Sequence, residues 1–557
     1  MPDQIFPITF KPGIRKDLPV SQNVYCTNAK WTRFYQGMPQ SMGGLYYYDI
    51  NNILPNFLNN DYTHYRVTNI EKNIVILWSE NATGKNTNNP PFLPANSQIN
   101  FLKIGNDQDA NAITRYQPNA QNNFPNLNNA AIIKGFAMKR PNCYLMWYIQ
   151  GVNSHMVLYI LDGNNSILVE NNGDIPNKKI TAVCISSNVV FFSESVTLWW
   201  FNLAGDVFNA DFGLVTILAN QANSDQKNTT DYEILKILEV RGGNISPTLL
   251  VWTTNSLVRF SNSGERIDQD NAFSYRFRKE TITNDSSILG NNPNVVVEYE
   301  GIFYWIGENK FYFYNGVVLT LENAISKQYF FDNLDRSQVD KIYCFKNEKY
   351  NEICWVYPTI NKAGLPETDR GRGTPLEMCN RILIYNVSDD CWYDTDFCSY
   401  SGSNEYFVAG LYNLDARPTF NNARLGKFTN LNDGQTDLNE ANIPDQVNMI
   451  TSFFTTPLYS FRLNNGLDKL IKIKRIEPNF YITERANSVT TVEIKAYRTL
   501  NTTSLNCDSS NLLTINSDND IIDYFIEGRY ITYTFKHTGF GYKMGQSLFT
   551  CTYGDSN

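Results

Sequence analysis

Residues 295–316, VVVEYEGIFYWIGENKFYFYNG, decide the fold of this chain. β-branched and aromatic residues fill three short runs, 295–299, 302–306 and 310–314, and Gly or Asn residues separate them. Short runs of this kind, bounded by Gly and Asn, are typical of antiparallel strands joined by tight turns. The stretch therefore predicts a three-stranded antiparallel meander.

Similar units recur along the chain, each with an apolar strand, a second strand that carries a large aromatic residue, and a third strand that runs into a Gly turn. Repetition every roughly 40 to 50 residues is typical of β-propeller blades. One small meander cannot cover its own apolar face, so neighbouring units must stack and the ring must close. We interpret the aromatic residues as packing anchors rather than ligand platforms; they are Trp78, Trp147, Phe192, Trp252, Trp305, Trp355 and Trp392.

The chain of 557 residues is too long for one ordinary core. We predict an all-β fold: a β-propeller-like array of antiparallel meanders over residues 46–445, preceded by a docking arm (1–45). A C-terminal β-sandwich or barrel-like domain follows (446–557), because strands after about residue 451 are longer and alternate cleanly. Three polar segments inside the propeller are expected to be surface loops: 81–98, 106–129 and 359–380.

Composition excludes some functional classes. The formal net charge is −8, and clustered Lys and Arg of the kind that a dedicated nucleic-acid reader needs are missing from the sequence. Residues 469–475, KLIKIKR, alternate as the solvated face of a strand does. The first ten residues do not resemble a signal peptide and no run of 18 apolar residues occurs, so we expect neither a cleaved signal nor a membrane-spanning segment.

Ten cysteines stand singly and form no CxxC pair. Scattered thiols in apolar strands indicate a reduced assembly compartment, although a bond between Cys391 and Cys398 stays open. His64, His155 and His537 are too far apart in sequence to suggest a metal triad. The sequence predicts no cofactor and no metal site.

Three carboxylates in the central unit, Glu298, Glu300 and Glu308, invite a glycosidase interpretation, because propellers host hydrolases with paired acids. The sequence lacks the S-x-D-x-G-x-T-W repeat and an Arg cluster for an anionic sugar. It also lacks a nucleophile elbow and a P-loop. We therefore predict that the protein is not an enzyme. After the central unit, residues 321–335 are the best helix candidate.

The N-terminal arm carries a family resemblance. The run FKPGI (10–14), the W-T-R-F strand (31–34) and the G-M-P-Q-S-M-G-G-L turn (37–45) resemble the opening of podovirus tail-nozzle proteins. These proteins of short-tailed bacteriophages are also called tail tubular protein B or packaged-DNA stabilisation proteins. This chain has Gln40-Ser41 where the family usually has Glu-Lys, and Leu45 where Trp is usual.

The central region extends the resemblance. The family carries G-x-x-Y-W-M-G-x-x-x-F-Y-x-Y-D-G, then a helix, then N-x-x-x-x-E-V-W-W-F-Y-P, then a strand that ends before a Trp. Residues 302–316, 351–358 and 381–392 match these patterns in the same order, with Asn315 in place of the usual Asp. The likeness covers the arm and most of residues 295–480.

The resemblance implies a virion tail protein that is assembled in the cytoplasm of the host bacterium. It would form a homohexameric ring below the portal and its adaptor, close the DNA channel before infection and open during ejection. Its partners would be the adaptor, tail fibres or tailspikes, and transiently the genomic DNA, without sequence-specific binding. The arm residues expected to dock on a partner are Lys11, Pro12, Arg15, Trp31, Arg33, Pro39, Gly43 and Gly44.

Two alternatives remain. A carbohydrate-binding or glycan-degrading tail receptor protein would use loops such as 81–98 and 359–380 to hold a sugar, and turnover of a surface glycan would favour it. An intracellular scaffolding propeller would be favoured by a stable monomer that binds peptides.

Overall fold

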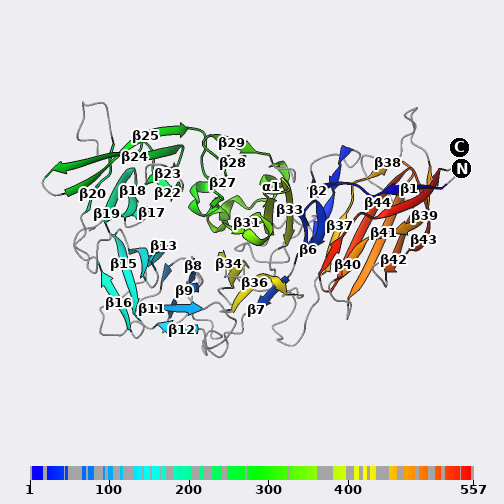
Figure 1. The fold of residues 1–557 in the computed structure, drawn as a ribbon, viewed down its shortest axis with the longest axis horizontal. Helices are drawn as coiled ribbons and strands as arrows, with labels where there is room; N and C mark the ends of the chain where they lie inside the picture. The colour runs from blue at the N-terminus through cyan, green and yellow to red at the C-terminus, as the bar shows by residue number, and fades with distance from the viewer. Residues whose placement is uncertain are drawn as a thin grey trace.

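The computed structural model of the chain describes residues 3–42 apart from 17–21, strand segments between 44 and 170, and most of 180–360. It also describes residues 381–396, strand segments between 407 and 434, and most of 451–553. Figure 1 shows a ring of sheets joined on one side to a smaller β domain, which carries both termini. This architecture confirms the predicted fold class, an all-β propeller-like array with an N-terminal arm and a C-terminal β domain.

Seven sheets of four or five strands make up the ring among the described residues. All their strand pairs are antiparallel except that between β21 and β25. In hydrogen-bonded order, sheet 1 consists of β12 (Ile113–Tyr116), β11 (Gln98–Ile104), β9 (Asn73–Glu80) and β8 (Tyr65–Ile70). Sheet 2 consists of β10 (Phe92–Leu93), β13 (Ala131–Arg140), β14 (Cys143–Gln150), β15 (Asn153–Asp162) and β16 (Asn165–Glu170). Sheet 3 consists of β17 (Ile180–Ser186), β18 (Val189–Glu194), β19 (Thr197–Asn202) and β20 (Phe212–Leu214). Sheet 4 consists of β21 (Thr216–Ile217), β25 (Ala272–Thr283), β24 (Leu257–Gln269), β23 (Thr248–Thr253) and β22 (Ile234–Glu239).

The last three sheets follow the same plan. Sheet 5 consists of β26 (Val296–Tyr299), β27 (Ile302–Ile306), β28 (Phe311–Tyr314) and β29 (Val318–Leu321). Sheet 6 consists of β30 (Tyr343–Asn347), β31 (Glu352–Tyr357), β32 (Arg381–Asn386) and β33 (Cys391–Asp396). Sheet 7 consists of β34 (Phe407–Tyr412), β35 (Pro418–Asn422), β36 (Lys427–Gly434) and β7 (Gly44–Tyr47).

Contacts between strands of neighbouring sheets close the ring. They lead from β8 to β13, β17 and β22, then from β26 to β30 and β34, and from β34 back to β8. Sheets 4 and 5 meet where Trp252 of β23 packs edge-on against Trp305 of β27, with ring centroids 5.8 Å apart. The outer strand of sheet 7 is β7, which comes from the N-terminal end of the chain and pairs with β36. The ring is therefore closed by two segments that are far apart in sequence.

Sheet 5 shows why these residues form a hairpin array. Glu300 and Gly301 join β26 to β27 with φ angles of 50° and 80°. Two positive φ angles match the twist of a two-residue hairpin. The Glu298 carboxylate accepts a hydrogen bond from the Gly301 amide (2.7 Å) and fixes the turn. A fourth strand, β29, follows the three that the sequence predicts, because Val318 and Leu321 pair with Tyr314 and Phe311.

Helix is scarce. The only α-helix in the described part of the chain is α1 (Lys327–Asn333), shorter than the predicted 321–335, because Leu321 belongs to β29. The predicted loops 81–98 and 106–129 contain β10 and β12, which pair with β13 and β11. The 3-10 helices are η3 (Leu289–Asn291), η4 (Pro293–Val295), η5 (Arg336–Lys341) and η6 (Glu348–Tyr350).

The C-terminal domain is built jointly by the two ends of the chain. Strands of the N-terminal arm pair with C-terminal strands in each of its three sheets. Sheet 8 consists of β1 (Gln4–Pro7), β46 (Leu548–Tyr553), β39 (Ile471–Glu477) and β43 (Ile522–Gly528). Sheet 9 consists of β4 (Asn28–Lys30), β37 (Thr451–Thr455), β44 (Tyr530–Thr538), β41 (Val489–Tyr497) and β42 (Ser509–Ile515), with β38 (Tyr459–Ser460) also on β44. Sheet 10 consists of β40 (Phe480–Ile482), β45 (Tyr542–Met544), β6 (Met38–Ser41) and β5 (Thr32–Tyr35), and a separate pair joins β2 (Lys11–Ile14) to β3 (Tyr25–Cys26).

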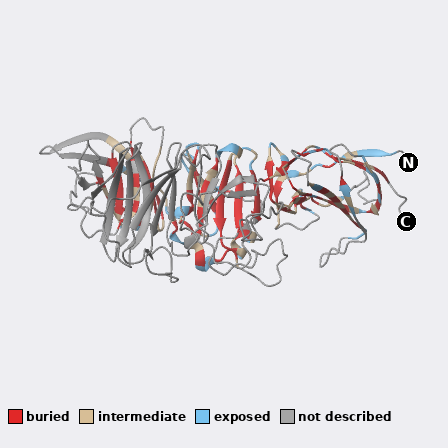
Figure 2. Ribbon diagram, turned by 90° about the horizontal axis from the view of Figure 1, so that it is seen from below, coloured by how far each residue is buried: buried red, intermediate tan, exposed pale blue. Residues whose placement is uncertain are grey.

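Buried side chains form a continuous core from the arm through sheets 5 and 6 into the C-terminal domain. Figure 2 shows these buried strand residues in both parts of the molecule. Sequence reasoning treats residues 1–45 as an arm that docks on something. In the structure this arm is a structural part of the C-terminal domain and also contributes the outer strand of sheet 7.

Candidate functional site

The contact between the arm and sheet 6 contains buried ion pairs. Strands β2, β4 and β5 of the arm contact β33, the outer strand of sheet 6. The Trp31 amide donates a hydrogen bond to Thr395 Oγ1 (2.9 Å). Gly13 has a φ of +103°, and a Cβ atom there would lie 2.9 Å from the Trp392 carbonyl oxygen. The backbones of the arm and sheet 6 therefore approach closely. We call this region the junction.

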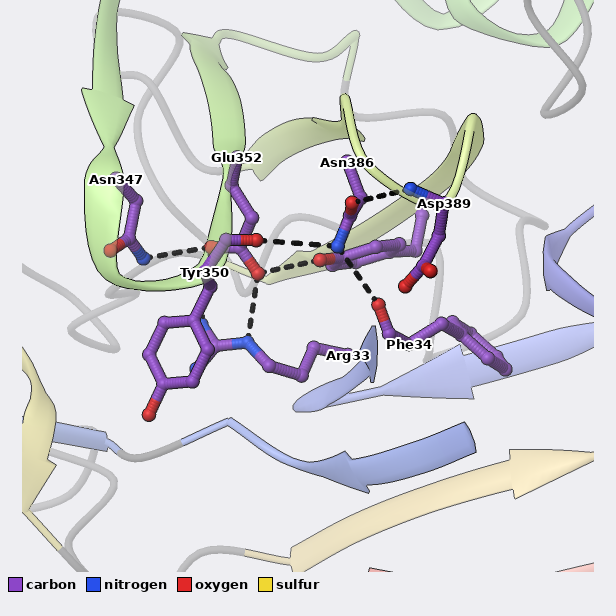
Figure 3. A network of polar contacts seen from close by, with 8 residues as sticks. Arg33, Phe34, Asn347, Tyr350, Glu352, Asn386 and Asp389 are labelled. Atoms are coloured by element: carbon purple, nitrogen blue, oxygen red, sulfur yellow. Dashed lines mark hydrogen bonds and ion pairs between the residues drawn. The ribbon is translucent and has the colours of Figure 1, made fainter. Parts of the chain in front are cut away.

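An ion pair lies at the centre of the junction (Figure 3). Arg33 Nε lies 2.8 Å from Glu352 Oε1, and Arg33 Nη2 lies 3.2 Å from Glu352 Oε2. The two side chains are 1% and 0% exposed. A carboxylate held by two parallel N–H groups is a strong and directional partner for arginine. The arm is therefore fixed in one register on sheet 6.

The Glu352 carboxylate receives two more hydrogen bonds. Asn347 Nδ2 donates to Oε2 (2.7 Å), and the Tyr393 hydroxyl donates to Oε1 (2.5 Å). On the other side, the Arg33 guanidinium stacks over the Tyr350 ring, 3.4 Å from its centroid. A buried charge is tolerated when it is paired and its remaining sites are hydrogen-bonded. The cluster satisfies that condition.

Electrostatics keep Arg33 charged and Tyr393 protonated. Burial tends to lower the pKa of Arg33, but the Glu352 carboxylate outweighs burial and the pKa is raised. Burial, reinforced by the negative charge of Glu352, raises the pKa of Tyr393 well above its ordinary value. The tyrosine therefore stays a hydrogen-bond donor to the carboxylate.

Asn386 connects the same strands through the backbone. Its Nδ2 donates to the carbonyl oxygens of Phe34 (3.1 Å) and Tyr350 (3.3 Å). Its Oδ1 accepts from the Asp389 amide (3.0 Å). The arm therefore contacts both the β30–β31 and the β32–β33 connections of sheet 6, as Figure 3 shows.

A second charged cluster lies at the same junction. Asp394 of β33 pairs with Arg381 of β32 and with Lys16 of the arm, whose Nζ lies 3.3 Å from Oδ1. Lys16 also donates to the Tyr329 hydroxyl of α1 (3.3 Å). Burial alone would raise the pKa of Asp394, but Arg381 and Lys16 together lower it. The carboxylate is thus held ionised inside the protein.

The sequence-predicted docking residues lie in different places. Trp31 and Pro39 are buried, and Arg33 lies in the junction. Lys11 and Arg15 approach the Tyr25 ring at 5.8 and 5.7 Å, beside the partly buried Pro12. Gly44 begins β7 and pairs with Gly434, and Gly43 lies outside the described residues. Trp31 and Arg33 therefore contact other parts of the same chain.

The predicted anchors occupy a common position. Six of them lie on the strands that pair with β8, β13, β17, β22, β26 and β30, namely β9, β14, β18, β23, β27 and β31. Phe192, Trp252, Trp305 and Trp355 are fully buried. Trp392 lies on the fourth strand of sheet 6 and stacks on Trp355, with centroids 5.9 Å apart. The side chains of Trp78 and Trp147 lie outside the described residues.

Sequence reasoning missed the acidic half of the junction. Glu352 is a lone acid at the start of the apolar strand EICWVY, and Asp394 follows Cys391-Trp392-Tyr393. A single charge in a strand that is otherwise apolar is a usable signal for a buried pair. The sequence does not show which basic residue pairs with each of these carboxylates.

The carboxylates that suggested a glycosidase have structural contacts. Glu308 accepts from the Gly290 amide (2.8 Å) and from Arg336 Nη1 (3.3 Å), and Glu298 fixes the β26–β27 turn. Glu300 lies in that turn. No group of His, Cys, Asp and Glu side chains suited to a metal ion occurs within the described residues.

Six cysteines of the described chain, including Cys391, are free thiols. Cys398, the possible disulfide partner of Cys391, lies outside the described residues. None of the helices in the described ranges is long and apolar enough to span a membrane.

Comparisons with known proteins find distant structural likenesses. No family model matches the chain, and no curated protein matches it. Among solved structures, the chain is similar to a protein from Lactobacillus plantarum, with 10% identity, 71% of this chain and 93% of that chain covered, and a TM-score of 0.34. It is similar to the β-propeller domain of the trilobed protease from Pyrococcus furiosus (10% identity, 69% and 100% covered, TM-score 0.31). It is also similar to prolyl oligopeptidase B from Galerina marginata (9% identity, 77% and 57% covered, TM-score 0.36). These likenesses are distant, and the assignment of the fold follows from the strand order of this chain.

Proposed function

We propose that the chain is a structural virion protein, the nozzle of a short phage tail that attaches below the portal and adaptor. In this function it serves as a conduit for the genome and turns over no substrate. Six copies would form the ring, and the protein would be assembled in the bacterial cytoplasm and reside in the virion tail. The proposal rests on the resemblance of the arm and of sheets 5 and 6 to the tail-nozzle family.

One observation supports it above the others: the motifs that carry the resemblance meet in space. Arg33 belongs to the W-x-R-F strand of the arm. Glu352 belongs to the matched segment 351–358, and the two side chains are bonded to each other in one buried cluster. Two motifs that are remote in sequence and bonded to each other are best explained by a shared structural role.

The junction connects the two parts of the subunit rigidly, as a structural component requires. Two buried charged clusters and three arm strands against β33 join the C-terminal domain to the ring. Relative domain motion is expected where an interface is small and polar, and is restricted where a continuous core crosses it. Here one core runs from the arm through sheet 6 into the C-terminal domain. Such a subunit suits a rigid assembly.

The charge fits a conduit. The chain carries a formal net charge of −8. Phosphate backbones bind where Lys and Arg neutralise them, and an acidic wall offers DNA little to bind. DNA would slide through such a ring rather than adhere to it.

Electron microscopy of the purified full-length chain, and of particles that contain it, tests the proposal. We expect six-fold rings with an axial opening, and the same rings at the tail end of the particle. A stable monomer, or one that depolymerises a capsular or lipopolysaccharide glycan in a parallel assay, would overturn it. A glycan array with the same preparation distinguishes sugar binding from sugar cleavage.

A further inference from the structure

The hairpin turn between β28 and β29 presents an unusual chemical arrangement. Tyr314 pairs with Val318, so the three residues Asn315, Gly316 and Val317 form the whole loop. All three are exposed. Gly316 has a φ of +118°, a backbone conformation that favours glycine. The turn therefore places an asparagine directly before an unhindered glycine at the surface.

The backbone amide of Gly316 is accessible. The Asn315 amide donates to the Val317 carbonyl (3.4 Å), but the Gly316 N–H has no hydrogen-bond partner among the described residues. Nothing lies within 4 Å of the position that a Cβ atom of Gly316 would take. Solvent base can reach this N–H, and no side chain blocks the approach of its nitrogen to the Asn315 side chain.

We propose that Asn315 is a site of spontaneous deamidation in the folded protein. The Gly316 backbone nitrogen loses its proton to solvent base and attacks Asn315 Cγ, which forms a C–N bond and a five-membered succinimide. The side-chain nitrogen takes up a proton and leaves as ammonia. One water molecule then opens the ring at either carbonyl, which gives aspartate or isoaspartate. Water is the only co-reactant.

The product changes the turn in a defined way. Aspartate at position 315 is the residue that the tail-nozzle pattern usually has there, so this branch restores the usual carboxylate. Isoaspartate instead lengthens the main chain by one carbon between two paired strands. Because β29 is the edge strand of sheet 5, this branch loosens an edge rather than the middle of the sheet.

The test is time-resolved peptide mass spectrometry of the intact full-length chain, incubated under mildly alkaline conditions in water enriched in oxygen-18. We expect the peptide that contains Asn315 to gain a labelled carboxyl oxygen. Fragmentation that separates aspartate from isoaspartate identifies both products. Local protection slows such chemistry, but the exposed turn at Asn315 offers little protection. We therefore expect the native rate to lie within about threefold of that in the denatured chain.

Two internal controls calibrate the rate. Asn294 is also exposed, but the branched residue Val295 follows it and crowds the attacking nitrogen, so it should stay intact over the same period. Denatured protein gives the intrinsic rate of the Asn315-Gly316 sequence itself. Reaction at Asn315 about tenfold slower in the native protein than in the denatured chain, or equal labelling of Asn294 and Asn315, would overturn the proposal.

Discussion

The Arg33 guanidinium and the Glu352 carboxylate meet in a fully buried two-point contact, although they lie 319 positions apart in the chain. One belongs to the N-terminal arm and the other begins the second strand of sheet 6. Neither charge has access to water, because the two side chains are 1% and 0% exposed.

Removing one partner should leave the other charge buried and unpaired. We expect Glu352→Gln or Arg33→Met to lower the free energy of unfolding by about 3 to 5 kcal/mol. Urea denaturation of the purified variants measures this. The matched control is the pair of Lys472 and Glu527 on sheet 8, which is partly exposed. Glu527→Gln should cost no more than about 1 kcal/mol.

Replacing both charges together should recover stability. The double variant Arg33→Met with Glu352→Leu removes the desolvation cost of two ions as well as their attraction, so its loss should be smaller than that of either single variant. A double-mutant cycle gives the coupling energy. A double variant as unstable as the sum of the two single ones would show that the pair is not coupled.

Trp305 fills the space between sheets 4 and 5 with no exposed surface. Trp305→Ala should cost about 3 to 5 kcal/mol, through lost burial and the cavity that remains. Chemical denaturation is again the measurement. Tyr481→Ala is the control, because Tyr481 is 61% exposed and its removal opens no cavity. An unchanged midpoint for Trp305→Ala would contradict the role of this residue as an anchor.

Gly13 and Gly301 distinguish two reasons why a position requires glycine: a positive φ angle and close contact with a neighbouring backbone. Both have positive φ, but an added Cβ meets nothing within 4 Å at Gly301 and lies 2.9 Å from the Trp392 carbonyl oxygen at Gly13. Gly301→Ala should cost about 1 to 2 kcal/mol from backbone strain alone. Gly13→Ala should cost at least about 1 kcal/mol more, because the arm must move off sheet 6. Equal losses in thermal unfolding would refute the close approach.

Asp394 should make the free energy of unfolding depend on pH in the acid range. Its pKa in the folded protein is lowered, so its contribution is complete above the unfolded value of about 3.9 and is lost as pH falls through the lower folded value. The stability difference between the wild type and Asp394→Asn should be constant above about pH 4 and shrink below it. Unfolding curves across the acid range measure this difference. Asp523→Asn, at a side chain that is 79% exposed, should give a small difference throughout.

Local patterns account for most of the ring. Alternating apolar residues and Gly-bounded turns predict three of the four strands of sheet 5 to within a residue. The repeated aromatic residues mark one strand in each of six sheets. These features depend on neighbours in the sequence. The strands β10 and β12 escaped prediction because they are short and lie within polar segments.

Pairings between segments that are far apart in the chain could not be predicted from the sequence. Nothing near Arg33 in the sequence specifies Glu352, and nothing in Gly44-Leu45 specifies β36 as the partner strand. The sequence does mark both Arg33 and Glu352 as charges among apolar neighbours, which predicts that each is paired. Only the tertiary structure says that they are paired with each other.

The use of β7 to close sheet 7 has a consequence for biosynthesis. β7 pairs with β36, which ends at Gly434, and β1 pairs with β46, which ends at Tyr553. During translation, β1 and β7 therefore stay without these partners until the segments of β46 and β36 have been made. Contacts between such distant segments slow folding, so the closure of sheet 7 and the completion of the C-terminal domain are expected to be late steps in folding.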